Sequence, residues 1–244
     1  MHMNDEQIIQ HVVAQLQSEL GTQLLGVLAG GSRLRGEGNL NSDLDLVVVI
    51  EGKRRRRKNI VADGVEVEMF FNPPFQMRRY FEEDRNSGRG LMPHLVSTGQ
   101  ICYDPRGVLA ELQAEAQTIW AAGPAPLSLE EQQWRLRYAF ADMLRDISDV
   151  VDDEEQATYL IGGWLPHVMN NYYRIQGRWL VKPKRVFRDL SSWDAPAAEL
   201  ARRATTGSAR ERYAAFEALV EHTLTSLGGP MPLEWQSEWE ELQL

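Results

Sequence analysis

The sequence predicts an α/β (α+β) first half with a small mixed sheet, followed by an all-α helical-bundle second half. Apolar runs of strand length, such as LDLVVVI at 44–50, occur only before residue 104. A segment rich in proline, alanine and glycine (AAGPAPL, 121–127) marks a boundary. Beyond it, apolar residues recur at helical spacing. We therefore expect two domains, residues 1–122 and 128–244.

In the first domain, alternating and helical hydrophobic patterns define the expected elements in order. Helices are predicted over 4–20, 75–85, 91–96 and 107–120, and strands over 24–29, 44–51, 60–71 and 100–103. The basic run KRRRRK at 53–58 is predicted to be an exposed hairpin tip that offsets the acidic charge of this domain. A nucleic-acid patch is the less favoured interpretation of this run.

In the second domain, Ser128 and Glu131 form a capping-box pattern that opens the first helix. Helices are predicted over 129–151, 154–176, 184–190, 196–204 and 209–227, with a further short helix in the tail, 230–244. Acidic side chains gather where the first two helices meet. They are either solvated helix ends or a wall that attracts a polycationic ligand. These residues are Asp146, Asp149, Asp152, Asp153, Glu154 and Glu155.

Composition excludes several classes of protein. The chain has 244 residues, is 43% apolar and 25% charged, and carries a net charge of −9, which argues against a general nucleic-acid binder. The single cysteine, Cys102, excludes an internal disulfide framework and a cysteine metal cage. The longest apolar runs have strand length, so we expect no membrane span. The polar N-terminal segment has no signal-peptide pattern, and the cytoplasm is the expected location.

The stretch 30–46 (GGSRLRGEGNLNSDLDL) organises the first domain. Its first two residues, Gly30 and Gly31, permit a tight turn and close approach of the backbone to a ligand. A helix beginning at Ser32 would direct backbone N–H groups and a hydroxyl toward an anion. Arg33 and Arg35 follow and either reach phosphate groups or remain solvated.

Two aspartates end this stretch, at the start of an apolar strand. Asp43 and Asp45 share one face of that strand, roughly 6.5 Å apart along it. A carboxylate inside an apolar run is costly to bury, and a second one beside it adds repulsion unless a cation is bound. On the next strand, Glu66 and Glu68 face the same way as each other. One of them can complete a three-carboxylate site for a hard cation. Glu68 is favoured by its apolar flank, and Glu66 remains open.

The pattern of these residues resembles the signature of the polymerase-β-type nucleotidyltransferase superfamily. Gly31-Ser32 is followed by three residues, Gly36, five residues, and then Ser42-Asp43-Leu44-Asp45-Leu46. A later strand carboxylate of the superfamily matches Glu66 or Glu68. The resemblance covers about residues 21 to 105. With its helical second domain, the whole chain is similar to aminoglycoside nucleotidyltransferases.

The resemblance implies a set of roles for these residues. Asp43, Asp45 and the third carboxylate would hold two Mg²⁺ ions, roughly 3.5–4 Å apart in such sites. The glycine–serine turn and Ser42 would bind the triphosphate. The third carboxylate would bind the second metal or act as general base. In the helical domain, Lys184 resembles a lysine that contacts the triphosphate.

The predicted function is therefore Mg²⁺-dependent transfer of a nucleoside monophosphate from a nucleoside triphosphate, ATP first, to a hydroxyl of a small molecule. An aminoglycoside-like acceptor is favoured, which would make the protein an antibiotic-resistance enzyme. Alternatives are the same chemistry on a protein or an RNA 3′ end, and a nucleotide-binding module without turnover. The acidic second domain disfavours RNA, and three intact carboxylates disfavour a pure binder. The sequence does not identify the acceptor, the preferred nucleotide base or the oligomeric state.

Overall fold

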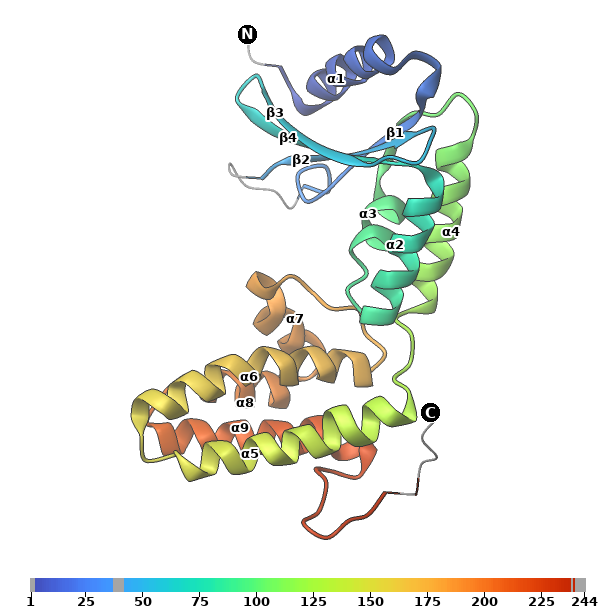
Figure 1. Cartoon of the computed structure of the whole chain (residues 1–244). Coiled ribbons are helices and arrows are strands. Elements are labelled where there is room, and N and C mark those ends of the chain that lie inside the picture. The colour runs from blue at the N-terminus through green and yellow to red at the C-terminus, as the bar shows by residue number, and fades with distance from the viewer. Residues whose placement is uncertain (1–2, 37–41, 238, 240–244) are drawn as a thin grey trace. The chain divides into compact units, whose positions relative to one another are not determined.

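The computed structural model describes residues 3–36, 42–237 and 239. It divides the chain into two compact units, Met1–Ala125 and Pro126–Leu244 (Figure 1). The first unit holds a five-stranded sheet and the second is built from helices. The predicted fold class, a small mixed sheet followed by a helical part, is confirmed.

The sheet of the first unit has the strand order β3-β4-β2-β1-β5. The central strands β1 (Leu24–Gly30) and β2 (Leu44–Ile50) are antiparallel, whereas β2 and β4 (Val65–Asn72) are parallel. At the edges, β3 (Arg56–Ala62) pairs antiparallel with β4, and β5 (Gln100–Tyr103) pairs antiparallel with β1. β2 therefore lies in the middle of the sheet.

Helices cover both faces of this sheet (Figure 1). α1 (Asp5–Leu20), followed by the short η1 (Gly21–Gln23), packs on the face that contains Leu46 and Val48 of β2. α2 (Pro74–Ser87), α3 (Leu91–Thr98) and α4 (Val108–Ala122) pack on the face that contains Val47 and Val49. Because side chains alternate along a strand, Asp45 shares the face of α2, α3 and α4.

The single strand predicted over 60–71 is wrong, because two strands occupy that region. β3 and β4 form a hairpin whose turn is Asp63-Gly64, and both turn residues have positive φ (49° and 82°). This dipeptide is a strong hairpin signal, since both central positions of such a turn need φ above zero.

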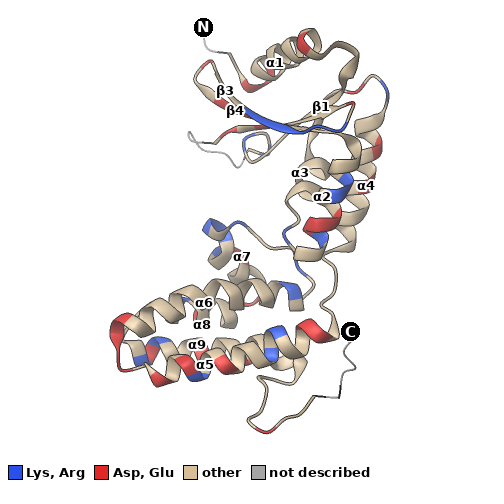
Figure 2. Cartoon of the chain, viewed as in Figure 1, with Lys and Arg blue, Asp and Glu red and all other residues tan. Residues whose placement is uncertain are grey.

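The basic run is consequently not a hairpin tip. Its second half, Arg56 to Lys58, lies on β3, where Figure 2 shows a basic band on the sheet. Arg56 and Lys58 lie toward α1, with amino or guanidinium nitrogens 4.0 and 3.6 Å from the Glu19 carboxylate. The Arg57 side chain lies on the opposite face of the sheet, because successive side chains of a strand point to opposite faces.

The second unit begins with the predicted capping box. The Glu131 N–H donates to the Ser128 hydroxyl (3.1 Å), and the Ser128 N–H donates to the Glu131 carboxylate (2.8 Å). A π-helical stretch, η2 (Glu131–Tyr138), and α5 (Ala139–Asp149) follow. The remaining elements are α6 (Glu154–Ile175), η3 (Pro183–Arg185), α7 (Val186–Trp193), α8 (Ala195–Arg203), α9 (Ala209–Leu224) and η4 (Thr225–Leu227). Among the described residues, no helix has the length and apolar character that crossing a membrane requires.

The tail differs from its prediction. Within 230–237 there is no helix, and the rest of the predicted tail helix, apart from residue 239, lies outside the described residues. Gly228 and Gly229 have φ of 88° and 78°, which breaks the helical path. The Arg137 guanidinium donates to the Gly229 carbonyl (2.8 Å), and the Met231 N–H donates to the Arg137 carbonyl (3.0 Å). The start of the tail, residues 229–231, is thus bonded to Arg137 of η2.

Candidate active site

Strand register brings three carboxylates together on one face of the sheet. Asp45 on β2 is the direct partner of Glu68 on β4, and Asp43 precedes β2 by one residue. One carboxylate oxygen from each residue lies within 4.8 Å of the other two, and all three residues are half-buried. The acidic cluster expected from the sequence is therefore formed by backbone pairing rather than by flexible side chains.

The structure distinguishes Glu66 from Glu68, the two candidates for the third carboxylate. Glu66 lies two residues before Glu68 on β4, is exposed, and accepts a hydrogen bond from the Asn59 side-chain amide (2.8 Å). Glu68 is half-buried and belongs to the cluster with Asp43 and Asp45. The geometry favours Glu68 as the third carboxylate.

Gly31 is required beside this cluster. Its φ is 91°, and a Cβ placed on it would lie 2.2 Å from Oδ2 of Asp45. That distance is far below any van der Waals contact, so a side chain here would displace the carboxylate. The glycine of the sequence motif thus makes room for Asp45 as well as for a turn.

The helix expected to begin at Ser32 is not formed. Residues 32–36 make turns, with the Gly36 N–H donating to the Arg33 carbonyl (3.2 Å), and Gly36 has φ of 69°. The dipole of a long helix is therefore not available to an anion here, although the N–H groups of the turn remain. Residues 37–41 of the motif lie outside the described residues.

The basic candidates of the motif occupy different surroundings. The Arg33 Nε donates to both carboxylate oxygens of Asp5 (2.8 Å each), and its Nη1 donates to the Ser42 carbonyl (3.2 Å). Arg33 thus joins the first turn of α1 to the segment that enters β2. Arg35 is half-buried on the turn. Lys184 lies exposed in η3 of the second unit, and its contact with a triphosphate stays a prediction.

One residue beside the cluster was missed by the sequence analysis. Arg57 on β3 forms an ion pair with Glu68, and its guanidinium carbon lies 4.8 Å from the centre of the Phe70 ring. The Arg57 side chain is 67% exposed, so this pair contributes about 0–1 kcal/mol and can be exchanged for another partner. Recognising the Asp63-Gly64 turn would have placed Arg57 on the carboxylate face.

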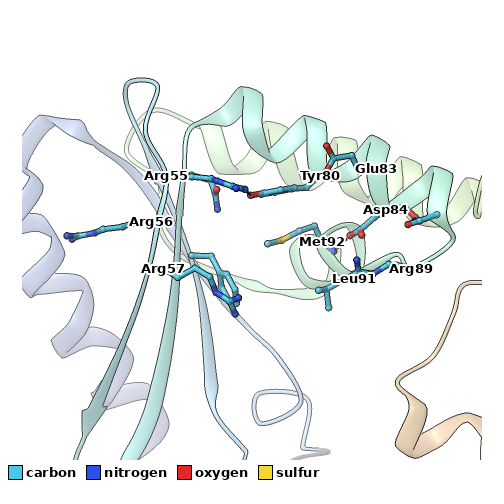
Figure 3. Close-up of a pocket in the computed structure, with 12 residues that line it drawn as sticks. Arg55, Arg56, Arg57, Tyr80, Glu83, Asp84, Arg89, Leu91 and Met92 are labelled. Carbon is cyan, nitrogen blue, oxygen red and sulfur yellow. Dashed lines mark hydrogen bonds between the residues drawn. The ribbon is translucent and has the colours of Figure 1, made fainter.

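A pocket of about 730 Å³ lies on the same face of the sheet, between β3, β4, α2 and α3 (Figure 3). Its wall includes Arg57 and Phe70 beside the carboxylates. Deeper in the same unit it includes Asp84, which is only 9% exposed and accepts the Met92 N–H (2.7 Å). Burial raises the pKa of Asp84, against the opposing effects of that hydrogen bond and of the nearby Arg89 charge.

The donor set of the cluster suits a divalent cation. Three carboxylates supply the hard oxygen ligands that Mg²⁺ and Mn²⁺ prefer. Three carboxylates within 4.8 Å repel one another when ionised, and a bound divalent cation would offset that repulsion. Asp43, Asp45 and Glu68 therefore fit the metal site that this arrangement implies.

Comparison with known proteins agrees with this geometry. Residues 11–102 match the family model of the nucleotidyltransferase domain, a segment that contains the glycine–serine turn and all three carboxylates. A crystal structure of a nucleotidyltransferase-like protein from Exiguobacterium sibiricum 255-15 is similar in fold, with a TM-score of 0.53 and 15% identity. The similarity covers 91% of this chain and 75% of that one, so it extends beyond the first unit. Among proteins with curated descriptions, none matches the sequence significantly.

The signature predicted from the sequence, the strand register of the carboxylates and the family match all concern the same segment of the chain. Residues 11–102, which hold the three carboxylates, accordingly match a nucleotidyltransferase domain of the polymerase-β-type superfamily.

Proposed function

We propose that this protein transfers a nucleoside monophosphate from a nucleoside triphosphate, ATP first, to a hydroxyl of a small molecule. The domain implies a nucleoside triphosphate substrate and a divalent metal in general terms. The observation that carries the proposal is the cluster of Asp43, Asp45 and Glu68, formed beside the Gly31 turn. Mg²⁺ is the proposed metal.

Each element of the site has a defined chemical task. Asp43, Asp45 and Glu68 would hold the divalent cation, which neutralises phosphate charge and lowers the pKa of the acceptor hydroxyl. The turn that begins at Gly31 offers backbone N–H groups and the Ser32 hydroxyl to the triphosphate. Arg33 donates to the Ser42 carbonyl (3.2 Å), directly before Asp43, and so holds the segment that enters β2.

The reaction balances without a further reagent. The acceptor oxygen forms a bond to the α-phosphorus, and the bond from that phosphorus to the bridging oxygen breaks in line, so pyrophosphate leaves. The hydroxyl proton passes to a carboxylate oxygen of Glu68 and then to solvent. Glu68 is suited to this task because it lies on β4, and its ion-pair partner Arg57 lines the pocket.

The acceptor needs a separate argument. The acidic junction of the second unit favoured a polycationic, aminoglycoside-like acceptor. Three of its six acids have internal partners in the structure: Asp152 pairs with Arg210, Asp153 accepts the Gln156 N–H, and Glu154 pairs with Arg212. The support for a polycationic acceptor is therefore weaker than the sequence suggested, and aminoglycosides become one class in an acceptor test.

The test combines each labelled nucleoside triphosphate, Mg²⁺ and the full-length protein with a panel of acceptors. The panel contains aminoglycosides, neutral alcohols, phosphorylated and carboxylated alcohols, a protein mixture and RNA. We expect pyrophosphate release with a small molecule, a mass increase of one nucleotide on it, and loss of both with EDTA. Labelling of protein or RNA alone would contradict the small-molecule acceptor. Binding of the triphosphate without release in any mixture would contradict catalysis.

A further inference from the structure

The carboxylate cluster has two different sides within the sheet. On one side of β2 lies β1, which ends in the turn at Gly31. On the other side lie β4 and β3, which carry Glu68 and Arg57. In the proposed function, the triphosphate binds at the Gly31 turn. Attack on the α-phosphorus occurs in line with the leaving group, so the acceptor must approach from the side of β4 and β3.

That side of the sheet contains the pocket. Its volume, about 730 Å³, lies within the roughly 300–1,000 Å³ typical of small-molecule sites. Phe70 lies two residues beyond Glu68 on the same strand face, so the pocket begins where the cluster ends. Arg57 contacts both regions, because it pairs with Glu68 and lines the pocket.

The cationic side of the pocket comes from two segments, β3 with the residue before it and the connection between α2 and α3. Arg55 and Arg57 point toward α2 and α3, whereas Arg56 points away (Figure 3). Arg55 donates to the hydroxyl of Tyr80, a neutral acceptor that leaves its positive charge in place. Arg89 adds a second positive charge from the opposite wall.

The two acidic side chains that line the pocket are already engaged. Glu83 accepts a hydrogen bond from Arg79 (2.7 Å), one helical turn before it on α2. Asp84 is nearly buried, accepts the Met92 N–H, and is attracted to Arg89. The pocket therefore presents more positive than negative charge to a ligand.

The same pocket has an apolar surface. The half-buried Phe70 ring lies under the Arg57 guanidinium, and Leu91 and Met92 contribute aliphatic atoms. Leu91 is 50% exposed and therefore offers apolar surface to a ligand. An apolar floor with arginines around it suits a ligand that has both an apolar body and an anionic group.

We propose that this pocket binds the acceptor, and that the acceptor carries a phosphate or carboxylate attached to an apolar, preferably aromatic, body. Arg55 and Arg89 bind the anionic group, Phe70 contacts the body, and the reacting hydroxyl lies near Glu68. The direction of approach rests on the proposed function, whereas the ligand chemistry rests on the pocket itself. The acceptor is then anionic rather than polycationic.

The first test measures binding without catalysis. Full-length, metal-free protein is dialysed to equilibrium against 4-nitrophenyl phosphate, which is detected by its absorbance. We expect Arg55→Gln and Arg89→Gln each to weaken binding about tenfold, the size expected for one charge-assisted hydrogen bond. The neutral 4-nitrophenyl glucoside should bind more weakly than the phosphate to the wild-type protein.

Lys58→Gln is the matched control. It removes the same charge from the same basic run, but Lys58 lies on the face of α1 with Glu19. We expect a change in binding below about twofold, because the lost charge is screened by distance and solvent. No binding of the probe, or equal weakening by Lys58→Gln and Arg55→Gln, would overturn the proposal.

Two further arms separate this proposal from the proposed function. Binding of 4-nitrophenyl phosphate should persist with saturating Mg²⁺ and a non-hydrolysable ATP analogue. Full competition would assign the pocket to nucleotide phosphates and overturn the acceptor site. Transfer to a neutral or cationic acceptor at a rate unchanged by Arg55→Gln would overturn the pocket proposal and leave the proposed function intact. Arginine-dependent binding without transfer to any acceptor supports the pocket and contradicts the proposed function.

Discussion

Two groups of acidic residues, one in each unit, look alike in sequence and differ in structure. In the first unit, Asp45 and Glu68 are direct partners on neighbouring parallel strands, and Asp43 lies beside them. At the junction of α5 and α6, in contrast, the side chains of Asp152 and Glu154 are 74% and 61% exposed. Each has an arginine from α9 as its partner.

The difference shows how secondary structure decides what acidic residues do. A strand with period two forces carboxylates onto one face, and the sheet then holds them against their repulsion. At a helix start, carboxylates instead meet backbone N–H groups and arginine side chains, which offset their charge. The first arrangement suits a bound cation, and the second stabilises a helix junction.

The largest expected effect is a loss of nucleotidyl transfer when one carboxylate of the first group is neutralised, with the same change in the second group as the comparison. Asp45→Asn should lower nucleotidyl transfer by at least about 10³-fold, equivalent to about 4 kcal/mol of transition-state stabilisation. Asp152→Asn is the matched control and should leave transfer within about twofold, because its partner is an exposed arginine. Pyrophosphate release measures both, and circular dichroism checks the fold. Near-wild-type transfer by Asp45→Asn would contradict the site.

A second pair of variants tests how tightly the turn fits the cluster. Gly31→Ala and Gly36→Ala share a positive φ, so each loses about 1 kcal/mol of folding stability from backbone strain. Only at Gly31 does the new Cβ collide with the Asp45 carboxylate, whereas at Gly36 no atom of the described residues lies within 4 Å of the new Cβ. We expect Gly31→Ala to lower transfer by about 100-fold, or 2.7 kcal/mol, and Gly36→Ala to retain far more activity. Equal losses would mean that strain alone matters.

The third pair distinguishes the two glutamates of β4. Glu68→Gln should raise the Mg²⁺ concentration that transfer requires by at least about tenfold, because a loss of this size already follows from removing a group that supports a metal ligand. It should also lower the rate at saturating Mg²⁺, because Glu68 accepts the hydroxyl proton. Glu66→Gln should leave the Mg²⁺ dependence unchanged, since Glu66 is exposed and bonded to Asn59. Titration of activity with Mg²⁺ measures the difference. A larger effect at Glu66 would reverse the assignment.

The smallest effect concerns the second group and depends on pH. Hydrogen bonds from Arg212 and the Ala209 N–H lower the pKa of Glu154. A lowered folded-state pKa adds stability above the unfolded-state value, about 4.3, and that stability is lost as pH falls through the lower value. Glu154→Gln should therefore lower the unfolding temperature at pH 7, and the difference from the wild type should shrink as the pH falls through the lowered folded-state pKa.

Glu155→Gln provides the control for this pH dependence. Glu155 is the exposed neighbour of Glu154 in the first turn of α6. The unfolding temperature of the Glu155→Gln protein should therefore equal that of the wild type at each pH. Thermal unfolding followed by circular dichroism measures all three proteins. A Glu154→Gln protein as stable as the wild type at pH 7 would show that its ion pair is energetically neutral.

The sequence predicted those features that follow from local pattern. The shared face of Asp43 and Asp45 follows from the spacing of two residues on a strand, and the Ser128 capping box follows from a pattern of four residues. The sequence favoured Glu68 by its apolar flank and left Glu66 open, whereas the pairing of Glu68 with Asp45 depends on the register between β2 and β4, which is set by the whole sheet. The superfamily and the fold class were predicted correctly from these local signals.

Other features depended on packing between distant segments. The pocket requires β3 and β4 to meet α2 and α3, and no local pattern contains that contact. The turn at Asp63-Gly64 was in the sequence, yet the long run of strand-forming residues around it concealed the reversal. In the tail a helix was predicted, but residues 230–237 are not helical, and the segment before them is held by Arg137, 92 residues from Gly229.

The position of β3 has a consequence for solubility. β3 is an outer strand of the sheet, and outer strands expose backbone groups that can pair with a second molecule and start aggregation. A copy of β3 that docked against this strand would bring Arg56, Arg57 and Lys58 of both molecules together, and repulsion between these charges opposes such pairing. The charges of Arg56, Arg57 and Lys58 therefore also oppose edge-to-edge pairing of the sheets of two molecules.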